Sequence, residues 1–126
     1  MVTDDVLVRR AMSARVGTVC TALDEMIRRR RWLLDEPALR VLEARGSAYI
    51  EGWLFAYRTM SLPDAERSER IGQGLAAENA HVREHACDLA GDFGLSSLKD
   101  ALLGLLDDED DAVREAVRCN AGMLGG

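Results

Sequence analysis

Residues 105–125 decide the fold of this chain, and their sequence is LLDDEDDAVREAVRCNAGMLG. Residues 74–94, which lie 31 positions earlier, have the sequence GLAAENAHVREHACDLAGDFG. Eight positions are identical in the two stretches: Leu75 and Leu106, Glu78 and Glu109, Val82 and Val113, Arg83 and Arg114, Glu84 and Glu115, Ala90 and Ala121, Gly91 and Gly122, and Gly94 and Gly125. Self-similarity at a fixed period of this length indicates two copies of one supersecondary unit.

Each copy is predicted to be a pair of helices joined by a short turn. In the second copy, two apolar runs at helical spacing flank a turn at 107–111; they are Leu98, Ala101, Leu102, Leu105 and Leu106, then Val113, Ala116, Val117, Ala121 and Leu124. The first copy is expected to have helices at 63–77 and 80–93, ended by Gly94. The expected N-caps are Ser61 and Asn79 in the first copy, then Ser96 or Ser97 and Asp110 or Asp111 in the second.

The repeat pattern decays upstream of residue 61. Asp35 and Ser47 are placed to cap two helices separated by Gly46, so residues 36–60 are predicted to form a degenerate third pair. Before this pair, apolar residues at three- and four-residue spacing predict one long helix, or two helices broken near Gly17. We expect residues 1–34 to cover the open end of the stack, because terminal repeats must shield it from water.

Composition supports an all-α class. Of the 126 residues, 48% are hydrophobic and 30% are charged, as in folded globular proteins, and only two are proline. Ala, Leu, Arg and Glu outnumber β-branched residues, which favours helix. We therefore predict an all-α protein, a short α-solenoid of about three antiparallel helix pairs with an N-terminal capping helix. One domain is expected over residues 1–126, divided into 1–34, 36–60, 63–94 and 96–125.

The two copies resemble the HEAT repeat, in particular the short form of phycobilisome-lyase-like proteins. The resemblance covers about residues 64–125; it rests on Val113-Arg114-Glu115-Ala116 between Leu105-Leu106-Asp107-Asp108 and Gly122-Met123-Leu124-Gly125, and on Val82-Arg83-Glu84 and Leu89-Ala90-Gly91. It implies that an acidic turn residue and an arginine of the second helix join neighbouring repeats. Asp108 or Asp110, with Arg83 and Arg114, would take those roles, whereas Ala77 and Asn79 occupy the acidic positions of the first copy.

Several features bear on the compartment. No apolar run approaches the roughly 20 residues that a membrane-spanning helix needs. Asp4 and Asp5 stand where a secretory signal would carry positive charge, so we expect a cytoplasmic protein. Cys20, Cys87 and Cys119 are odd in number and lie within helical patterns, which predicts reduced, core-packed thiols rather than disulfides.

Charge is distributed unevenly along the chain. Residues 1–60 hold ten Lys/Arg against eight Asp/Glu, net +2, whereas residues 61–126 hold six against fourteen, net −8. An acidic surface repels nucleic acid and anionic membranes and attracts basic partners. The partner-binding residues are therefore predicted on the second helix and in the acidic turn, although such a run is more often a solvated turn; they are His81, His85, Asp88 and Asp92, then Asp107, Asp108, Asp110 and Asp111.

Two other patterns lie in the N-terminal half. Tyr49, Trp53 and Tyr57 share one helix face, which is more often core but is also an alternative partner-binding surface. The run Arg28 to Arg31 beside Trp32 could contact phosphates, yet arginines also belong at the negative end of a helix dipole. We favour the dipole interpretation because the net charge of the chain is negative.

Residues 81–85 match the H-x-x-E-H arrangement, in which two histidines bind zinc and a glutamate acts as a base. Val82, Arg83 and Glu84 are already explained by the repeat, since the second copy has the same three residue types without histidines. The chain has only these two histidines and offers no recognisable third ligand helix, apart from a weak site that would involve Asp88. We expect no metal and no cofactor.

No catalytic motif stands out from the repeat pattern, so a non-enzymatic protein-binding module is the function expected from the sequence. A stoichiometric inhibitor, for example an immunity protein that masks a basic site on a toxin, would suit a small acidic chain. Two alternatives stay open: an accessory subunit of a lyase-type enzyme, and a nucleic-acid binder similar to the HEAT-like DNA glycosylases. The former would need a bilin or a catalytic partner and the latter a basic groove. The oligomeric state is left open.

Overall fold

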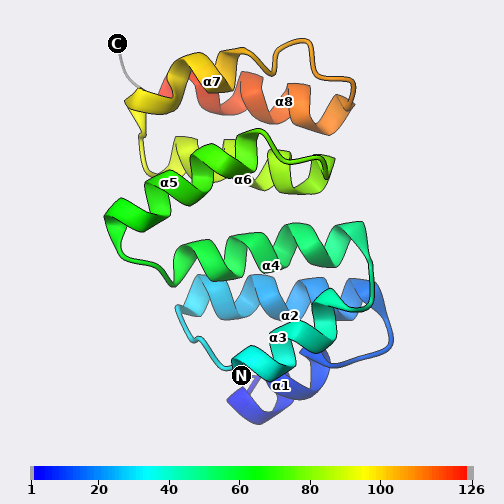
Figure 1. Ribbon diagram of the computed structural model, residues 1–126. Helices are drawn as coiled ribbons and strands as arrows, with labels where there is room; N and C mark the ends of the chain where they lie inside the picture. The colour runs from blue at the N-terminus through cyan, green and yellow to red at the C-terminus, as the bar shows by residue number, and fades with distance from the viewer. Residues whose placement is uncertain (1, 125–126) are drawn as a thin grey trace. The chain divides into compact units, whose positions relative to one another are not determined.

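The computed structural model describes residues 2–124 (Figure 1). Its α-helices are α1 (Asp4–Ala11), α2 (Val16–Arg29), α3 (Glu36–Glu43), α4 (Ala48–Met60), α5 (Asp64–Leu75), α6 (Ala80–Asp92), α7 (Lys99–Leu103) and α8 (Asp111–Asn120), with 3₁₀ turns η1 (Ser96–Leu98) and η2 (Ala121–Leu124). The described residues contain no strand. The predicted all-α class is confirmed.

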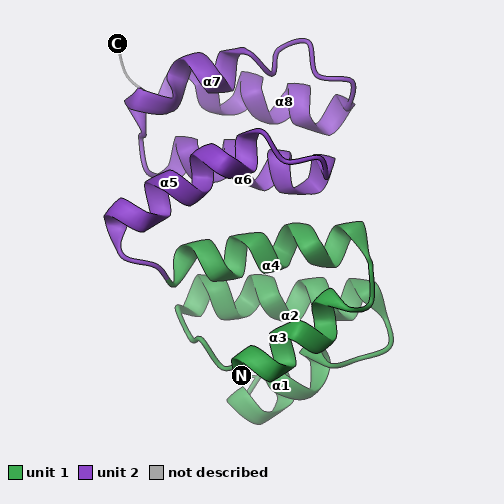
Figure 2. Ribbon diagram, viewed as in Figure 1, with its two compact units in different colours: residues 1–61 green, residues 62–126 purple. Residues whose placement is uncertain are grey.

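Contacts within the chain define two compact units, residues 1–61 and residues 62–126 (Figure 2). Unit 1 holds α1 to α4, and unit 2 holds α5 to α8 with η1 and η2. The sequence led us to expect a single domain. Segment 36–60, which we expected to form a degenerate repeat, lies in the same unit as the N-terminal helices.

In unit 1, α2 packs against both α1 and α4, and α3 packs against α4. Their apolar faces form one core: Leu7, Ala11, Val19, Ala22, Leu23, Met26, Leu34, Leu39, Leu42, Ile50, Leu54 and Tyr57. The N-terminal segment is two helices, and the break at residues 12–15 lies just before Gly17, the second residue of α2. There the Arg45 guanidinium donates to the freed carbonyls of Ser13 at 2.6 Å and Ala14 at 2.8 Å.

In unit 2, α6 packs against α5 on one side and α8 on the other, and η2 contacts α6 and α8. The buried apolar side chains are Ile71, Leu75, Ala86, Cys87, Leu89, Ala90, Leu102, Val113, Ala116, Val117 and Leu124. The first helix of the second copy is shorter than expected, because α7 ends at Leu103. Leu106, which the pattern placed on that helix, is 44% exposed.

Four helix starts follow the sequence prediction. Asp35 accepts a hydrogen bond from the Ala38 N–H at 3.0 Å, and Ser47 accepts one from Ile50 at 3.3 Å. In unit 2, Asn79 accepts from the His81 N–H, and Asp110 accepts from the N–H groups of both Ala112 and Val113. These side chains satisfy donors that the first helical turn leaves without partners.

Two predicted caps are wrong. The N-cap of α5 is Pro63, while the Ser61 hydroxyl instead donates to the Arg58 carbonyl at 2.8 Å, at the end of α4. The N-cap of α7 is Leu98, because Ser96 and Ser97 are taken up in the 3₁₀ turn that precedes it. A serine that follows a helix closely can bond to that helix rather than open the next one.

The cysteines differ from each other in burial. Cys87 is buried, Cys20 is partly exposed and Cys119 is exposed, and all three are free thiols. The core position predicted for Cys119 is therefore wrong, since its side chain is exposed on α8. Burial raises the pKa of the Cys87 thiol to about 12. Within residues 2–124, no helix is long and apolar enough to span a membrane.

Candidate functional site

Unit 2 contains a largely buried ion pair between Arg83 on α6 and Asp108 in the turn before α8. The guanidinium donates from Nε to Oδ2 and from Nη2 to Oδ1, both at 3.0 Å. Its Nη1 also donates to the carbonyls of Ala77 at 2.9 Å and Glu78 at 2.8 Å. The family resemblance left Asp108 or Asp110 open as the acid of such a pair, and it is Asp108 that pairs with Arg83.

Both side chains of this pair lie at least nine-tenths within the protein, with 10% and 8% exposure. Burial alone would raise the pKa of Asp108, but hydrogen bonds from Arg83 and from the Asp110 N–H hold it below its ordinary value. The hydrogen bond to Asp108 likewise raises the pKa of Arg83. The pair is therefore fully charged at neutral pH and joins α6 to the second copy.

The two copies repeat this arrangement in part. Arg114, the counterpart of Arg83, donates to the carbonyl of Asp108, which is the counterpart of Ala77. Its only ion-pair partner among the described residues is Asp111, three residues earlier on the same helix. Asn79 and Asp110 cap α6 and α8 at positions that also differ by 31. The internal repeat is thus visible in polar contacts as well as in sequence.

The acidic run 107–111 divides into residues with different tasks. Asp108 forms the ion pair with Arg83, and Asp110 is the N-cap of α8. Asp111 is 93% exposed at its side chain and pairs with Arg114. Asp107 and Glu109 are exposed and have no ion pair among the described residues. Of the four aspartates in this run, all of them predicted to bind a partner, only Asp107 and Asp111 are therefore presented to solvent without a structural role in the turn.

The predicted strip on α6 consists of two partly buried histidines and two exposed aspartates. Burial, and to a lesser extent the charge of His81, lower the pKa of His85 to about 4, so His85 is neutral at physiological pH. Burial and the neighbouring Asp92 raise the pKa of Asp88. Among residues 2–124, no group of three or more His, Cys, Asp and Glu side chains is arranged to hold a metal ion.

Asp88 has a structural partner that the sequence did not indicate. The amide Nδ2 of Asn120 on α8 donates to Asp88 at 2.8 Å and to the Ala116 carbonyl at 2.7 Å. Asn120 lies against the backbone of Gly91, where a Cβ would stand 2.1 Å from its Oδ1. The glycine therefore permits the close approach of α8 to α6, and Asp88 is only partly available to a partner.

The aromatic face of α4 is divided between core and surface. Tyr57 is 2% exposed; its hydroxyl accepts a hydrogen bond from the Leu34 N–H at 3.0 Å and donates to the Leu34 carbonyl at 3.4 Å. Trp32 meets the Tyr57 ring edge-on at 5.3 Å. Tyr49 is 61% exposed and Trp53 packs partly against the core. The alternative partner-binding set therefore includes one residue, Tyr57, that is not at the surface.

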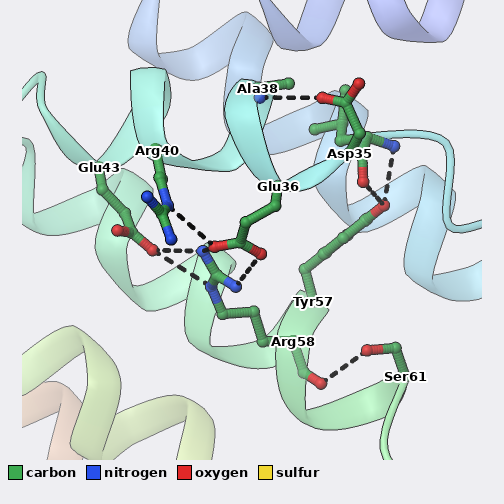
Figure 3. Close-up of polar contacts among 9 residues, drawn as sticks. Asp35, Glu36, Ala38, Arg40, Glu43, Tyr57, Arg58 and Ser61 are labelled. Carbon is green, nitrogen blue, oxygen red and sulfur yellow. Dashed lines mark hydrogen bonds and ion pairs between the residues drawn. The ribbon is translucent and has the colours of Figure 1, made fainter.

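Next to Tyr57, Arg58 joins α4 to α3 (Figure 3). Its guanidinium forms two hydrogen bonds of 2.9 Å with the Glu36 carboxylate, and Glu43 accepts from the same group at 2.7 Å. These bonds raise the pKa of Arg58 and lower that of Glu36. The sequence does not indicate this cluster, because Glu43 and Glu36 lie 15 and 22 residues from Arg58 without a recognisable motif.

The basic run at 28–31 is largely engaged within unit 1. Arg28 pairs with Asp24 and Glu25, and Arg29 pairs with Glu25 and donates to the Val2 carbonyl. Arg31 pairs with Asp4. The run ends α2, as the dipole interpretation requires. Three of these four arginines therefore already have partners within the protein.

Unit 2 also contains a cavity of about 230 Å³, lined by Asp64, Arg67, Ser68, Phe93 and Leu95. The Arg67 guanidinium lies 4.5 Å from the centre of the Phe93 ring and donates to Asp64 and to the Leu62 carbonyl. Pockets for small molecules are usually about 300–1,000 Å³. The cavity is smaller than that. The Arg67 guanidinium in its wall bonds within the unit through Nη1 and Nη2, while its buried Nε has no hydrogen-bond partner among the described residues.

Comparisons with family models, with characterised proteins and with solved structures give no significant match. The interpretation of the surface therefore depends on its own geometry and charge.

Proposed function

We propose that this chain is a non-enzymatic protein-binding module, and that the acidic surface of unit 2 binds a basic protein partner. The proposal is supported by the ion pairs of unit 2, because most of its basic side chains pair with carboxylates of the same unit. Arg67, Arg83, Arg114 and Arg118 all pair with carboxylates of their own unit. Lys99 and Arg70 are the remaining two of its six basic residues. The positive charge is thus largely engaged within the fold, while most of the fourteen carboxylates stay at the surface.

The acids that supply the binding charge are those without a structural task. Within residues 62–124 they are exposed and have no ion pair among the described residues: Glu66, Glu69, Glu78, Asp92, Asp100, Asp107 and Glu109. Near the turn, Asp110 and Glu109 lie close enough to Arg83 to raise its pKa. A concentration of one sign of charge attracts an oppositely charged partner over roughly a Debye length, about 10 Å at ordinary ionic strength.

A stoichiometric inhibitor or immunity protein that masks the basic site of its target is the specific form we propose. Such a protein needs a rigid surface and no chemistry of its own. We also propose that the helices are arranged as HEAT-like antiparallel pairs in a short α-solenoid. The repeated contacts of Arg83 and Arg114, and the caps at Asn79 and Asp110, support that arrangement because they recur at one period of 31 residues.

The test begins with affinity capture of the partner from the source cells and continues with binding kinetics over a series of salt concentrations. We expect the association rate to fall by about tenfold or more from low to physiological salt, since steered association has this dependence. The variant Asp107→Asn with Glu109→Gln should associate more slowly than the wild-type protein at the same low salt concentration. It leaves Asp108 and Asp110 in place, so the fold is preserved.

The matched control is Glu66→Gln with Glu69→Gln, which removes the same charge from α5. Equal slowing by both double variants would show that net charge matters and the turn does not. A partner whose association does not depend on salt would contradict the proposed acidic interface. Loss of such binding in a Trp53→Ala variant would place the interface on unit 1.

A further inference from the structure

The arginines of unit 1 divide into those with ion pairs and those without. Residues 1–60 contain ten arginines, and five of them pair with carboxylates of the unit: Arg28, Arg29, Arg31, Arg40 and Arg58. The other five form no ion pair within residues 2–124; they are Arg9, Arg10, Arg15, Arg30 and Arg45. Four of these five are found around one turn, residues 12–15 between α1 and α2, whereas Arg30 lies at the other end of α2.

Three segments of the chain bring the four arginines to this turn. Arg9 and Arg10 are in the last turn of α1, and Arg15 is the N-cap residue of α2. Arg45 comes from the loop between α3 and α4, and its guanidinium donates to two carbonyls of the turn, at 2.6 Å and 2.8 Å. The two loops lie at the same end of unit 1 in Figure 1. These four residues form what we call the arginine turn.

The positive charge of the arginine turn is not compensated by the part of the chain that the structure describes. All four arginines are exposed. The first turn of α2 contains no acidic residue, so the positive end of that helix dipole adds to the charge of Arg15. Asp5, four residues before Arg9 on α1, is exposed and forms no ion pair. Like charges held close together repel each other, so a bound anion would stabilise this region.

A phosphate group suits such a cluster better than a carboxylate does. One guanidinium can hold two carboxylates, as Arg58 does with Glu36 and Glu43, so a single carboxylate would leave most donors of four guanidiniums without a partner. A phosphate group has a charge of about −1.5 to −2 and three acceptor oxygens, so it can bond to several guanidiniums at once. About two phosphate groups would balance the four positive charges.

The charges elsewhere in the chain restrict the size of the ligand. A long polyanion such as nucleic acid extends beyond one turn, and the net charge of the chain, −6, repels it. A second copy of the chain has the same net charge and is repelled in the same way. A small anion contacts only the turn, and its approach is open, because a Cβ at Gly17 would meet no described heavy atom within 4 Å.

We propose that the arginine turn is a binding site for a small phosphate compound, one with two or three linked phosphate groups. The guanidiniums of Arg9, Arg10 and Arg15 donate to the phosphate oxygens. Arg45 is fixed to the turn by its bonds to two carbonyls and adds its charge to the site. The site lies in unit 1, so it goes beyond the proposed binding of a basic protein by unit 2 and does not depend on it.

The probe is inorganic tripolyphosphate, added to the full chain and followed by calorimetry and by nuclear magnetic resonance of the backbone amides of residues 12–17. We expect one ligand per chain and shifts that are confined to unit 1. Arg9→Gln with Arg10→Gln should weaken binding by at least about tenfold, since each charged hydrogen bond contributes about that factor or more. The matched control is Arg30→Gln with Arg40→Gln, which removes the same charge from other positions of unit 1 and should change the affinity by less than about twofold.

The variant Arg15→Ser separates binding from folding. Serine is a preferred N-cap and arginine is not, and the backbone at residue 15 already has the extended conformation of an N-cap, with φ −87° and ψ 119°. The variant should therefore melt at a higher temperature than the wild-type protein, yet bind tripolyphosphate at least about tenfold more weakly. Unchanged binding by this variant would contradict the role of Arg15.

Other ligands are tested with the same variants. The proposal is overturned if tripolyphosphate does not bind, or if it binds equally well to Arg9→Gln with Arg10→Gln. It is also overturned if a 20-nucleotide oligothymidylate, or vesicles of phosphatidylglycerol, bind through these arginines more than about tenfold more tightly than tripolyphosphate does, because the surface would then be one for nucleic acid or for membrane. A dimer in light scattering that Arg9→Gln with Arg10→Gln dissociates would assign the arginine turn to a second copy instead.

Discussion

Removing the Arg83 guanidinium should destabilise unit 2 strongly. In Arg83→Met the apolar stem is kept, but the Asp108 carboxylate loses both of its 3.0 Å hydrogen bonds and the carbonyls of Ala77 and Glu78 lose their donor. Both charged side chains are about nine-tenths buried. Breaking a buried pair by removing one partner costs about 3–5 kcal/mol, since the other charge stays without compensation. We expect a loss of that size in the free energy of unfolding.

The assay is chemical denaturation followed by two signals. Both tryptophans, Trp32 and Trp53, lie in unit 1, so their fluorescence reports unit 1, whereas far-ultraviolet circular dichroism reports the helices of both units. In Arg83→Met, the midpoint of the circular dichroism transition should move to a lower denaturant concentration. The double variant Arg83→Met with Asp108→Leu should lose less free energy of unfolding than the two single variants lose in sum. A coupling energy of about 2 kcal/mol is expected for groups in direct contact.

Arg118→Met is the matched control, because its pair with Glu115 is 57% and 66% exposed and should contribute at most about 0.5 kcal/mol. A loss of less than about 1 kcal/mol in Arg83→Met would show that burial does not make this pair important for stability. The dependence of stability on pH tests the same ion pair. Because the pKa of Asp108 is lowered, its contribution is present above the ordinary value of 3.8 and is lost as the pH falls through the lower folded value.

Three further outcomes are expected. Gly91→Ala should cost about 1–3 kcal/mol of unfolding free energy in denaturation, because the new Cβ would overlap Asn120, whereas Gly122→Ala should change it by no more than about 0.5 kcal/mol; equal effects would contradict the packing described. Tyr57→Phe leaves the buried Leu34 N–H unpaired and should lower the free energy of unfolding by about 1–3 kcal/mol. An unchanged free energy of unfolding would mean that a water molecule replaces the hydroxyl. The pKa of His85 is lowered from 6.5 to about 4, so stability should decline as the pH falls from 6.5 towards 4, by up to about 3 kcal/mol; nuclear magnetic resonance titration of His85 near 6.5 would disprove this.

Most helix caps could be predicted from the sequence. Asp35, Ser47, Asn79 and Asp110 cap helices as predicted, because a cap depends only on residues within one turn. An ion pair between Arg83 and an acid of the turn was also anticipated, but from a family resemblance that left Asp108 and Asp110 open.

Other residues of the candidate site could not be assigned from sequence. Asn120 stands among small and polar residues, and nothing in the pattern indicates that it bonds to Asp88, which lies 32 positions away. Tyr57 shares a helical face with Tyr49, yet only Tyr57 reaches Leu34 and becomes buried. The acidic run 107–111 looks uniform in sequence although two of its members are structural. In each case the decisive contact joins residues that local pattern does not relate.

The sequence by itself determined the helical class, the period of 31 residues and most helix ends, because each of these follows from backbone propensity and from contacts within one or two turns. Only the tertiary structure decided which charges are available to a partner. Asp108 and Asp107 are adjacent and chemically identical, but one faces Arg83 on another helix and the other faces water. Burial and pairing depend on how distant segments pack, so the charge that a surface presents is a property of the fold and not of the composition.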